Sequence, residues 1–220
     1  MSLIGRFSRF WKSPWLEKTQ SVAGFYWSLK TQFYYRLFFA GIGQKSKLIA
    51  PMRLRNVHNI QIGKNVIVNR YVFLLTLQED TVVPRLTIGN GSVLGHMNHI
   101  TCIREVEIGE NVLTADRVYI SDHSHGFSDT TVPISKQAVV SKGKVSIGNG
   151  TWLGENVTVL SCNIGKNCAI GANAVVLSDI PDYCVAVGAP ARVIRRWDPT
   201  SRNWERIAAN ERHMPAELGD

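Results

Sequence analysis

A six-residue repeat runs through much of this 220-residue chain and constrains its fold more than any other feature. Each unit sets an aliphatic residue, often followed by glycine, ahead of two polar residues and then a small or β-branched residue. The clearest unit is Ile108–Leu113, which reads Ile-Gly-Glu-Asn-Val-Leu, and others begin at residues 62, 68, 88, 94, 114, 147, 153, 164 and 170. Six residues are too few for a helix and a turn, but they suit one short strand followed by a corner at which Gly and Asn tolerate a positive φ.

Three such units make one triangular coil, and stacked coils place each recurring Ile, Val or Leu above the preceding one. The stack buries a continuous aliphatic column and joins each coil to the next by backbone hydrogen bonds. The repeat therefore predicts an all-β core folded as a parallel β-helix. The period does not fix its hand, because the general rule for parallel crossovers favours right-handed connections.

The repeat is interrupted twice. Residues 74–85 break the period and predict an inserted loop that contains Pro84. The second interruption begins within Tyr119–Asp129, which reads Tyr-Ile-Ser-Asp-His-Ser-His-Gly-Phe-Ser-Asp and brings two histidines and two aspartates together. We expect the chain to leave the coils there as a protruding loop over residues 121–144, and we expect the chemistry to lie on that loop.

The ends of the chain differ from the repeats. We expect residues 1–50 to form a basic helical extension and residues 51–196 to form the β-helix. Residues 197–220 are expected to form a tail with a short helix at about 203–212. An amphipathic helix is expected over residues 21–39, and Pro14 predicts a break or a helix start. The apolar residues at helical spacing are Val22, Phe25, Tyr26, Leu29, Phe33 and Leu37. Two roles are open: covering the first coil, or contacting an anionic membrane surface through residues 1–40.

The composition of the chain limits its possible partners and its cellular compartment. The 25 basic and 17 acidic residues give a formal charge of +8, which suits an anionic ligand, nucleic acid or an anionic membrane without choosing among them. The four cysteines, none in a Cys-x-x-Cys pair, indicate buried reduced thiols. No apolar run reaches the roughly 18–20 residues of a membrane span. These features favour a cytoplasmic protein, either free or peripheral at the inner face of the membrane.

Three motifs carry a resemblance to a known family. They are the Val-x-Ile-x4-His spacing of Val118, Ile120 and His125, the Ile-Gly-x-x-x-Trp-Leu-Gly of Ile147–Gly154, and the closing run Gly188–Arg195. With the repeat, they resemble the hexapeptide-repeat acyltransferases, and among them the sugar and polysaccharide O-acetyltransferases, such as the galactoside and maltose enzymes. The resemblance implies a left-handed parallel β-helix. It is strong over residues 108–196, looser over 59–107 and absent from 1–50.

In that family a loop histidine is the general base, and the motif spacing assigns this role to His125, with His123 as the second candidate. A sugar hydroxyl is a poor nucleophile until its proton is removed, and a neutral imidazole can remove it near pH 7. Either Asp122 or Asp129 would orient the imidazole, although a backbone carbonyl would serve as well.

The resemblance also implies contacts to the two substrates. Asn98 matches an acceptor-binding asparagine, and a purely conformational role at a corner is its alternative. Trp152 matches a tryptophan near the active site, with packing as its alternative. The implied coenzyme contacts are Gly154 and Ala172 for the pantetheine arm and Arg192 and Arg195 for the phosphates. Leu177-Ser178 stands where many relatives have Thr-Lys, so Lys166 or Arg196 is expected to replace that contact.

The sequence thus predicts an acetyl-CoA-dependent O-acetyltransferase that acts on a sugar or glycan hydroxyl without a metal. The resemblance further implies a homotrimer with active sites between subunits, and no nucleic-acid partner. The chief alternative is an N-acetyltransferase of an amino or nucleotide sugar. Two further alternatives are a zinc protein like the γ-class carbonic anhydrases, built from His96, His99, His123 and His125, and a non-catalytic trimeric scaffold.

Overall fold

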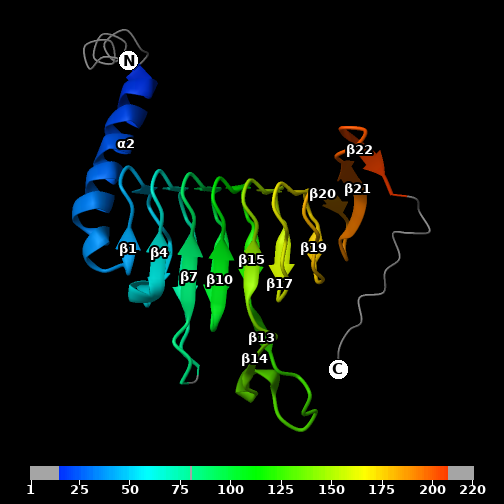
Figure 1. Ribbon diagram of the computed structural model, residues 1–220. Helices are drawn as coiled ribbons and strands as arrows, with labels where there is room; N and C mark the ends of the chain where they lie inside the picture. The colour runs from blue at the N-terminus through cyan, green and yellow to red at the C-terminus, as the bar shows by residue number, and fades with distance from the viewer. Residues whose placement is uncertain (1–14, 80, 208–220) are drawn as a thin grey trace.

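The protein is a triangular prism of stacked coils with a helix at its N-terminal end and a hairpin on one side (Figure 1). The computed structural model describes residues 15–79 and 81–207. Within them the helices are α2 (Trp15–Phe33), η1 (Tyr35–Leu37), η2 (Val57–Asn59) and η3 (Ile134–Lys136). The β-helix expected from the repeat is confirmed.

Three sheets form the sides of the prism, and most coils contribute one short strand to each, while the last coils join the first sheet only through isolated bridges at Ile164 and Ile180. The first sheet contains β1 (Gly41–Ile42), β4 (Ile60–Ile62), β7 (Arg85–Ile88), β10 (Glu105–Ile108) and β15 (Val145–Ile147). The second contains β2 (Lys47–Leu48), β5 (Ile67–Val68), β8 (Val93–Leu94), β11 (Leu113–Thr114), β16 (Trp152–Leu153), β18 (Ala169–Ile170), β20 (Cys184–Val187), β21 (Arg192–Asp198) and β22 (Asn203–Arg206). The third contains β3 (Arg53–Arg55), β6 (Phe73–Thr76), β9 (His99–Cys102), β12 (Tyr119–Ser121), β17 (Thr158–Leu160) and β19 (Val175–Val176).

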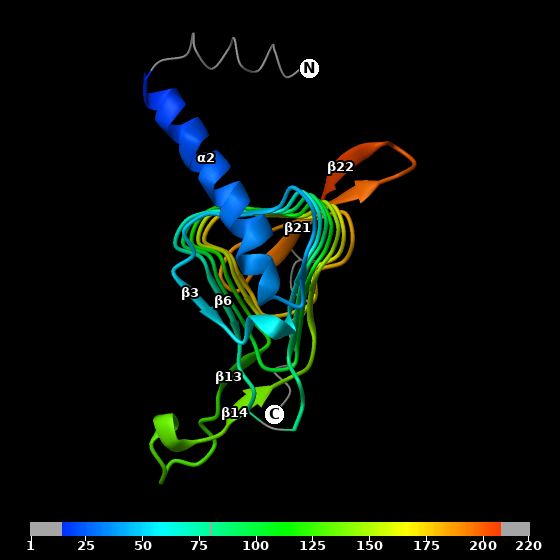
Figure 2. The same ribbon diagram turned by 90° about the vertical axis from the view of Figure 1, so that its left-hand side faces the viewer.

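The coil is left-handed. Seen from its N-terminal end, the chain rises along the first sheet, crosses the second and descends along β3 while receding from the viewer (Figure 2). Neighbouring coils pair in parallel, so equivalent residues of successive coils lie directly side by side. The coils begin at β1, earlier than the expected residue 51, because Gly41 and Ile42 already pair with Gln61 and Ile62.

The core is an aliphatic column. Ile62, Ile88, Ile108 and Ile147 are partners in register along the first sheet, and each is at most 1% exposed. Burying one such side chain contributes about 1.5–3 kcal/mol. The four cysteines are free and buried, as predicted.

Residues with positive φ turn the corners, as the repeat predicted. Asn65, Asn111 and Asn156 have φ between 52° and 58°. Gly89 serves a different purpose, because a Cβ there would lie 2.4 Å from the carbonyl carbon of Gly109 in the next coil. The close stacking of coils therefore depends on glycine at that position.

The chain leaves the coils where the period breaks. A loop after β6 carries the first insertion, and the second is an antiparallel hairpin of β13 (His123–His125) and β14 (Val139–Ser141). Figure 1 shows this hairpin projecting from the prism. It lies within the loop predicted over residues 121–144.

The N-terminal helix begins directly after Pro14 and ends at Phe33, several residues before the expected end at 39. Its last turn contacts the first coil: Thr31 Oγ1 accepts a hydrogen bond from the N–H of Leu48 at 2.9 Å, and Gln32 Nε2 donates to the carbonyl of Ser46 at 3.1 Å. The helix does cover the end of the coils, but it does so with its polar side. The prediction that the apolar stripe covers the first coil was wrong.

The C-terminal region is also different from the expectation. Residues 203–206 form strand β22, which pairs with β21 and sets Trp204 beside Trp197, with ring centroids 5.7 Å apart. The predicted helix at 203–212 is therefore wrong over residues 203–206, and residues 208–212 lie outside the described chain. β21 in turn pairs antiparallel with β20 and crosses the expected domain boundary at residue 196.

Over residues 15–79 and 81–207, no helix is both long enough and apolar enough to cross a membrane.

Candidate active site

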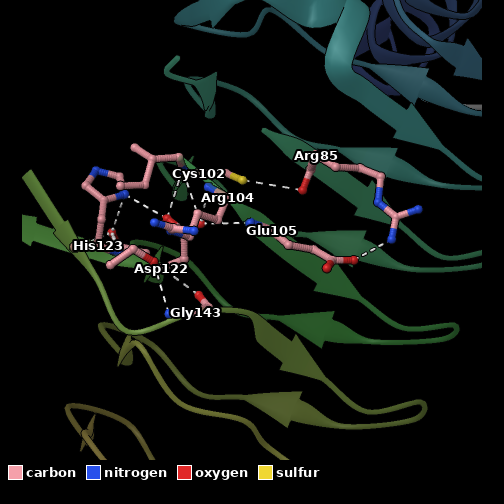
Figure 3. A network of polar contacts seen from close by, with 10 residues as sticks. Arg85, Cys102, Arg104, Glu105, Asp122, His123 and Gly143 are labelled. Carbon is pink, nitrogen blue, oxygen red and sulfur yellow. Dashed lines mark hydrogen bonds and ion pairs between the residues drawn. The ribbon is translucent and has the colours of Figure 1, made fainter. Parts of the chain in front are cut away.

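Asp122 and His123 form a hydrogen-bonded pair at the point where the hairpin leaves the coils (Figure 3). Strand β12 ends at Ser121, and the side chain of Asp122 turns inward and is fully buried. It accepts hydrogen bonds from three consecutive backbone N–H groups, at 2.9 Å from Ile103, 2.7 Å from Arg104 and 2.9 Å from Glu105. The carboxylate thus occupies an anion site made by the neighbouring coil.

Burial is the largest single effect on the pKa of Asp122 and acts to raise it. The hydrogen bonds from His123 and from the N–H groups of Ile103 and Arg104 act the other way, and together they hold the pKa below its ordinary value. Asp122 is therefore ionised at neutral pH, and a buried carboxylate of this kind favours a proton on its partner imidazole nitrogen.

His123 is oriented by this carboxylate. Its Nδ1 donates to Asp122 Oδ1 at 2.8 Å and also lies 3.3 Å from the hydroxyl of Ser121, while its side chain is only 12% exposed. With Nδ1 as the donor, Nε2 is the nitrogen that can accept a proton. The pair thus has the composition of a base and its orienting group.

The other predicted members of this cluster are placed differently. His125 lies two residues further along β13, where its backbone pairs with Val139 and its side chain is exposed. Within the described part of the chain, Asp122 contacts His123 and not His125. The carboxylate of Asp129 binds the N–H and hydroxyl of Thr131 at 2.8 and 2.6 Å, so it orients a turn.

A row of rings on the third sheet was not identified from the sequence. Phe73, His99 and Tyr119 are partners in register on β6, β9 and β12, and their ring centroids are 5.0 and 5.3 Å apart. The pKa of His99 is lowered, first by burial and then by the charges of His123 and Arg53. The row therefore lies close to the Asp122–His123 pair. The regular repeat contained the signal, because it places these three residues at the same position in successive coils.

Asn98 lies inside the coil. Its Nδ2 donates to the hydroxyl of Thr114, its Oδ1 accepts from the N–H of Val118 at 2.8 Å, and no part of it is exposed. Both polar ends of the amide are therefore bound within the fold. The structure gives Asn98 the conformational role rather than the acceptor contact.

Most of the positions expected to hold the coenzyme gather at one corner, between the second and third sheets. A Cβ on Gly154 would lie 2.7 Å from the backbone nitrogen of Ala172, so the two residues are stacked directly. Ala191, just before Arg192, donates its N–H to Val175 at the same corner. Trp152 lies nearby on the outer face of β16 and is 43% exposed.

Lys166 and Arg195 lie elsewhere. Lys166 is at the corner between the first and second sheets. Its Nζ lies 3.6 Å from Oδ2 of Asp182 and 5.4 Å from the centre of the Tyr183 ring. Arg195 and Arg196 are exposed on β21, where they pair with Val185 and Cys184. Lys166 therefore does not join the Gly154–Ala172 corner.

The two halves of the site are separated along the third sheet. The Gly154 corner precedes β17, whereas the Asp122–His123 pair follows β12, and these two strands run parallel and adjacent. At about 3.3 Å per residue, the intervening strand and its flanks span roughly 15 Å. Two surface hollows, one beside β21–β22 and one beside Pro84 and Arg85, are lined by neither His123 nor Trp152. No group of three His, Cys, Asp or Glu side chains suited to a metal lies within residues 15–79 and 81–207.

The comparisons with known proteins agree with this geometry. No protein-family model matches the chain. The galactoside O-acetyltransferase of Escherichia coli is 29% identical over 167 residues, covering 76% of this chain and 68% of that protein. The chain is thus similar to the hexapeptide-repeat acetyltransferases. It is also 43% identical over 136 residues to the Mycobacterium tuberculosis protein named probable acetyltransferase Rv3034c, and 38% identical over 115 residues to the E. coli protein WbbJ, named a putative lipopolysaccharide biosynthesis O-acetyl transferase.

The chain spans about half the length of those two relatives, 44% and 59%. Among solved structures, the protein is similar to a maltose O-acetyltransferase from Clostridium difficile 630, with TM-score 0.50, 26% identity and coverage of 82% of this chain and 84% of that one. It also shares the fold of AntD, an N-acyltransferase from Bacillus cereus crystallised with dTDP and 3-hydroxybutyryl-CoA, with TM-score 0.64, 20% identity and coverage of 78% and 90%.

Replacement of Asp122 by Asn tests the anion site. In the variant, a neutral amide replaces the carboxylate that accepts hydrogen bonds from the backbone N–H groups of residues 103–105. We therefore expect the free energy of unfolding at pH 7 to fall by about 3 kcal/mol. The folded pKa of Asp122 lies below the ordinary value near 3.9, so its contribution is complete above that value and is lost as pH falls through the folded pKa. Urea unfolding from pH 7 to pH 3 should show the gap between the two proteins narrowing below about pH 4.

The matched control is Asp129→Asn, which changes an exposed carboxylate and should leave stability at pH 7 almost unchanged. The anion site would be contradicted if the wild type and Asp122→Asn differed in the free energy of unfolding by the same amount at pH 7 and pH 3. It would also be contradicted if Asp129→Asn lost as much stability at pH 7 as Asp122→Asn.

Proposed function

We propose that this protein transfers an acetyl group from acetyl-CoA to a hydroxyl group of a sugar or glycan, with the Asp122–His123 pair as general base. The observation that carries the proposal is the imidazole whose Nδ1 is held by a buried carboxylate, on the fold of a family of sugar acetyltransferases. A hydroxyl becomes a competent nucleophile when a positioned base takes its proton during attack.

The roles of the pair follow from its hydrogen bonds. His123 Nε2 accepts the proton of the acceptor hydroxyl, and the negative charge of Asp122 stabilises the imidazolium that results. The three N–H donors keep Asp122 ionised while it does so. The motif spacing assigned the base to His125, and the contact with Asp122 is the reason to favour His123.

The coenzyme is proposed to lie along the corner between the second and third sheets. Acetyl-CoA supplies the acetyl group as a thioester. Gly154 and Ala172 are stacked directly at this corner and would line the narrow pantetheine chain, and Arg192, which adjoins the corner, provides positive charge for the phosphates. Trp152 provides an exposed apolar surface beside that chain.

The acceptor is proposed to bind on the row of Phe73, His99 and Tyr119. Partly exposed rings offer an apolar surface for the C–H face of a sugar, and the polar edges of His99 and Tyr119 can pair with hydroxyls. The row passes close to His123, so a sugar resting on it would present a hydroxyl to the base. It replaces Asn98, whose amide is bound inside the coil.

A homotrimer is proposed to complete the site. One chain holds its base and its coenzyme corner roughly 15 Å apart across the third sheet. Flat prism faces pack around a threefold axis, and a head-to-tail arrangement brings the base of one chain to the coenzyme corner of the next.

Thiol release from acetyl-CoA, measured over a panel of sugars, amino sugars and glycan fragments, tests the proposed function. We expect release with at least one hydroxyl acceptor and an acetyl ester in the product by NMR. No release with any acceptor would contradict acetyl transfer. An amide in every product would instead assign N-acetyl transfer to an amino sugar, since the same base can deprotonate an ammonium group.

His123→Ala should lower kcat by about 10² to 10⁴-fold, the usual contribution of a general base, with little change in the KM for acetyl-CoA. His125→Ala is the matched control, on the same strand two residues away, and should retain most of its kcat. The reverse pattern, an inactive His125→Ala and an active His123→Ala, would move the base to His125.

Tyr119→Ala should raise the KM for the acceptor by about tenfold while kcat and the KM for acetyl-CoA stay near the wild-type values, because the ring contributes binding surface and no proton transfer. Thr158→Ala, the next position in register on the same sheet, is the control. An unchanged acceptor KM in Tyr119→Ala would remove the row from the acceptor site.

Mixed oligomers test the shared site. His123→Ala and Trp152→Ala chains should each have low activity, but trimers formed from an equal mixture should regain activity in about a quarter of their sites, which combine an intact His123 from one chain with an intact Trp152 from another. Light scattering gives the size of the assembly. Activity in an isolated single chain, or no recovery in mixed trimers, would contradict a site between chains.

A further inference from the structure

Helix α2 contacts the β-helix through its polar side. Thr31 is fully buried and accepts the N–H of Leu48, and Gln32 donates to the carbonyls of Gly43 and Ser46 at 3.3 and 3.1 Å. These contacts satisfy backbone groups of the first coil, which has no preceding coil to pair with. The rotation of the helix about its axis is set by them.

As a result, the opposite side of α2 faces away from the protein. Apart from the adjacent Phe25 and Tyr26, its apolar residues follow one another at intervals of three or four, so they form one stripe along the helix. We call this set the outer stripe: Val22 58%, Phe25 65%, Tyr26 54%, Leu29 42% and Phe33 75% exposed. The apolar surface continues in the next turn with Leu37 and Phe38, which are 76% and 52% exposed. A continuous apolar surface of this kind on one helix face indicates an external partner.

The position of α2 at the end of the prism would allow it to lie against an extended flat surface. Figures 1 and 2 show α2 at the N-terminal end of the prism, extending beyond the edge of the coils. Contact along α2 therefore leaves the sides of the prism, where the candidate active site lies, uncovered.

The charge of this part of the sequence identifies the chemistry of the partner of α2. Residues 1–40 contain six basic residues and a single acidic one, Glu17. Lys30 lies beside the rings of Trp27 and Tyr35, with Nζ 5.0 and 5.4 Å from their centroids, and Arg36 follows in η1. Apolar and aromatic residues combined with basic residues are typical of a helix in the interface of an anionic bilayer. A second copy fits less well, because pairing two identical faces brings like charges together.

We propose that the outer stripe and its basic residues bind the surface of an anionic lipid bilayer, with α2 lying in the interface. The proposal does not depend on the transferase activity. It rests on the orientation of α2, on the exposure of the outer stripe and on the net positive charge of residues 1–40.

Flotation of the full chain with vesicles tests the proposal. One set of vesicles contains phosphatidylcholine alone, and the other contains phosphatidylcholine and phosphatidylglycerol in equal parts. We expect the protein to float with the mixed vesicles at low salt, and to float less at high salt and with phosphatidylcholine alone. Absence of the protein from the floating fraction with mixed vesicles at low salt would overturn the proposal.

Two variants separate the apolar and charged contributions. Phe25→Ser combined with Leu29→Ser and Phe33→Ser should abolish flotation, and Lys30→Gln combined with Arg36→Gln should weaken binding to the mixed vesicles about 30-fold. Met52→Ser combined with Val83→Ser is the matched control, since both residues are 64% exposed and lie outside the outer stripe, and it should bind like the wild type.

The thermal stability and the oligomer size of the triple variant are measured as well. Phe25, Leu29 and Phe33 are exposed and do not belong to the buried core, so the melting temperature of the triple variant should stay close to that of the wild type. Flotation that survives the triple substitution would overturn the proposal. So would a wild-type oligomer that dissociates on triple substitution while the wild type does not bind vesicles, because the stripe would then bind a second copy.

Discussion

Parallel pairing between successive coils is the interaction on which the rest of the structure depends. Because each coil bonds to the next through its backbone, with Ile62, Ile88 and Ile108 in register, every position of the repeat has a fixed place on one side of the prism. This pairing requires the close approach seen at Gly89, where any side chain would meet the backbone of the next coil. It also aligns residues distant in sequence, so that Phe73, His99 and Tyr119 form a row without any local motif.

The candidate base depends on the same pairing and on its local failure. At the end of β12 the chain leaves the coils for the hairpin, so the N–H groups of residues 103–105 in the neighbouring coil lose the strand that would have paired with them. The carboxylate of Asp122 takes the place of that strand. A buried charge is costly unless it is fully hydrogen-bonded, and here its remaining acceptor capacity is used by His123. The break in the period therefore produces both the hairpin and the oriented imidazole.

The sequence alone was enough to predict the features of the structure that repeat from coil to coil. The period predicted the coils, the buried aliphatic column, the corner asparagines and the position of the hairpin, and the cluster after Tyr119 contained the candidate base. It was not sufficient to choose between His123 and His125, because residues two apart on a strand face the same side, and only the structure shows which imidazole meets Asp122. Asn98 was ambiguous for a similar reason: an amide suits a sugar hydroxyl and a coil corner equally well, and only its contacts with Thr114 and Val118 separate the two.

The ends of the prism were the least predictable parts, and the reason is physical. A terminal coil exposes unpaired backbone groups, and these must be satisfied by whatever segment adjoins them. At the C-terminal end β21 pairs antiparallel with β20, and residues 203–206, which were expected to be helical, pair with β21 as a strand. At the N-terminal end the same demand is met by Thr31 and Gln32, whose side chains bind backbone groups of the first coil. Hydrogen bonding thus takes precedence over apolar burial in setting the rotation of α2. The apolar stripe, which would cover the core of an ordinary globular protein, is left facing outward.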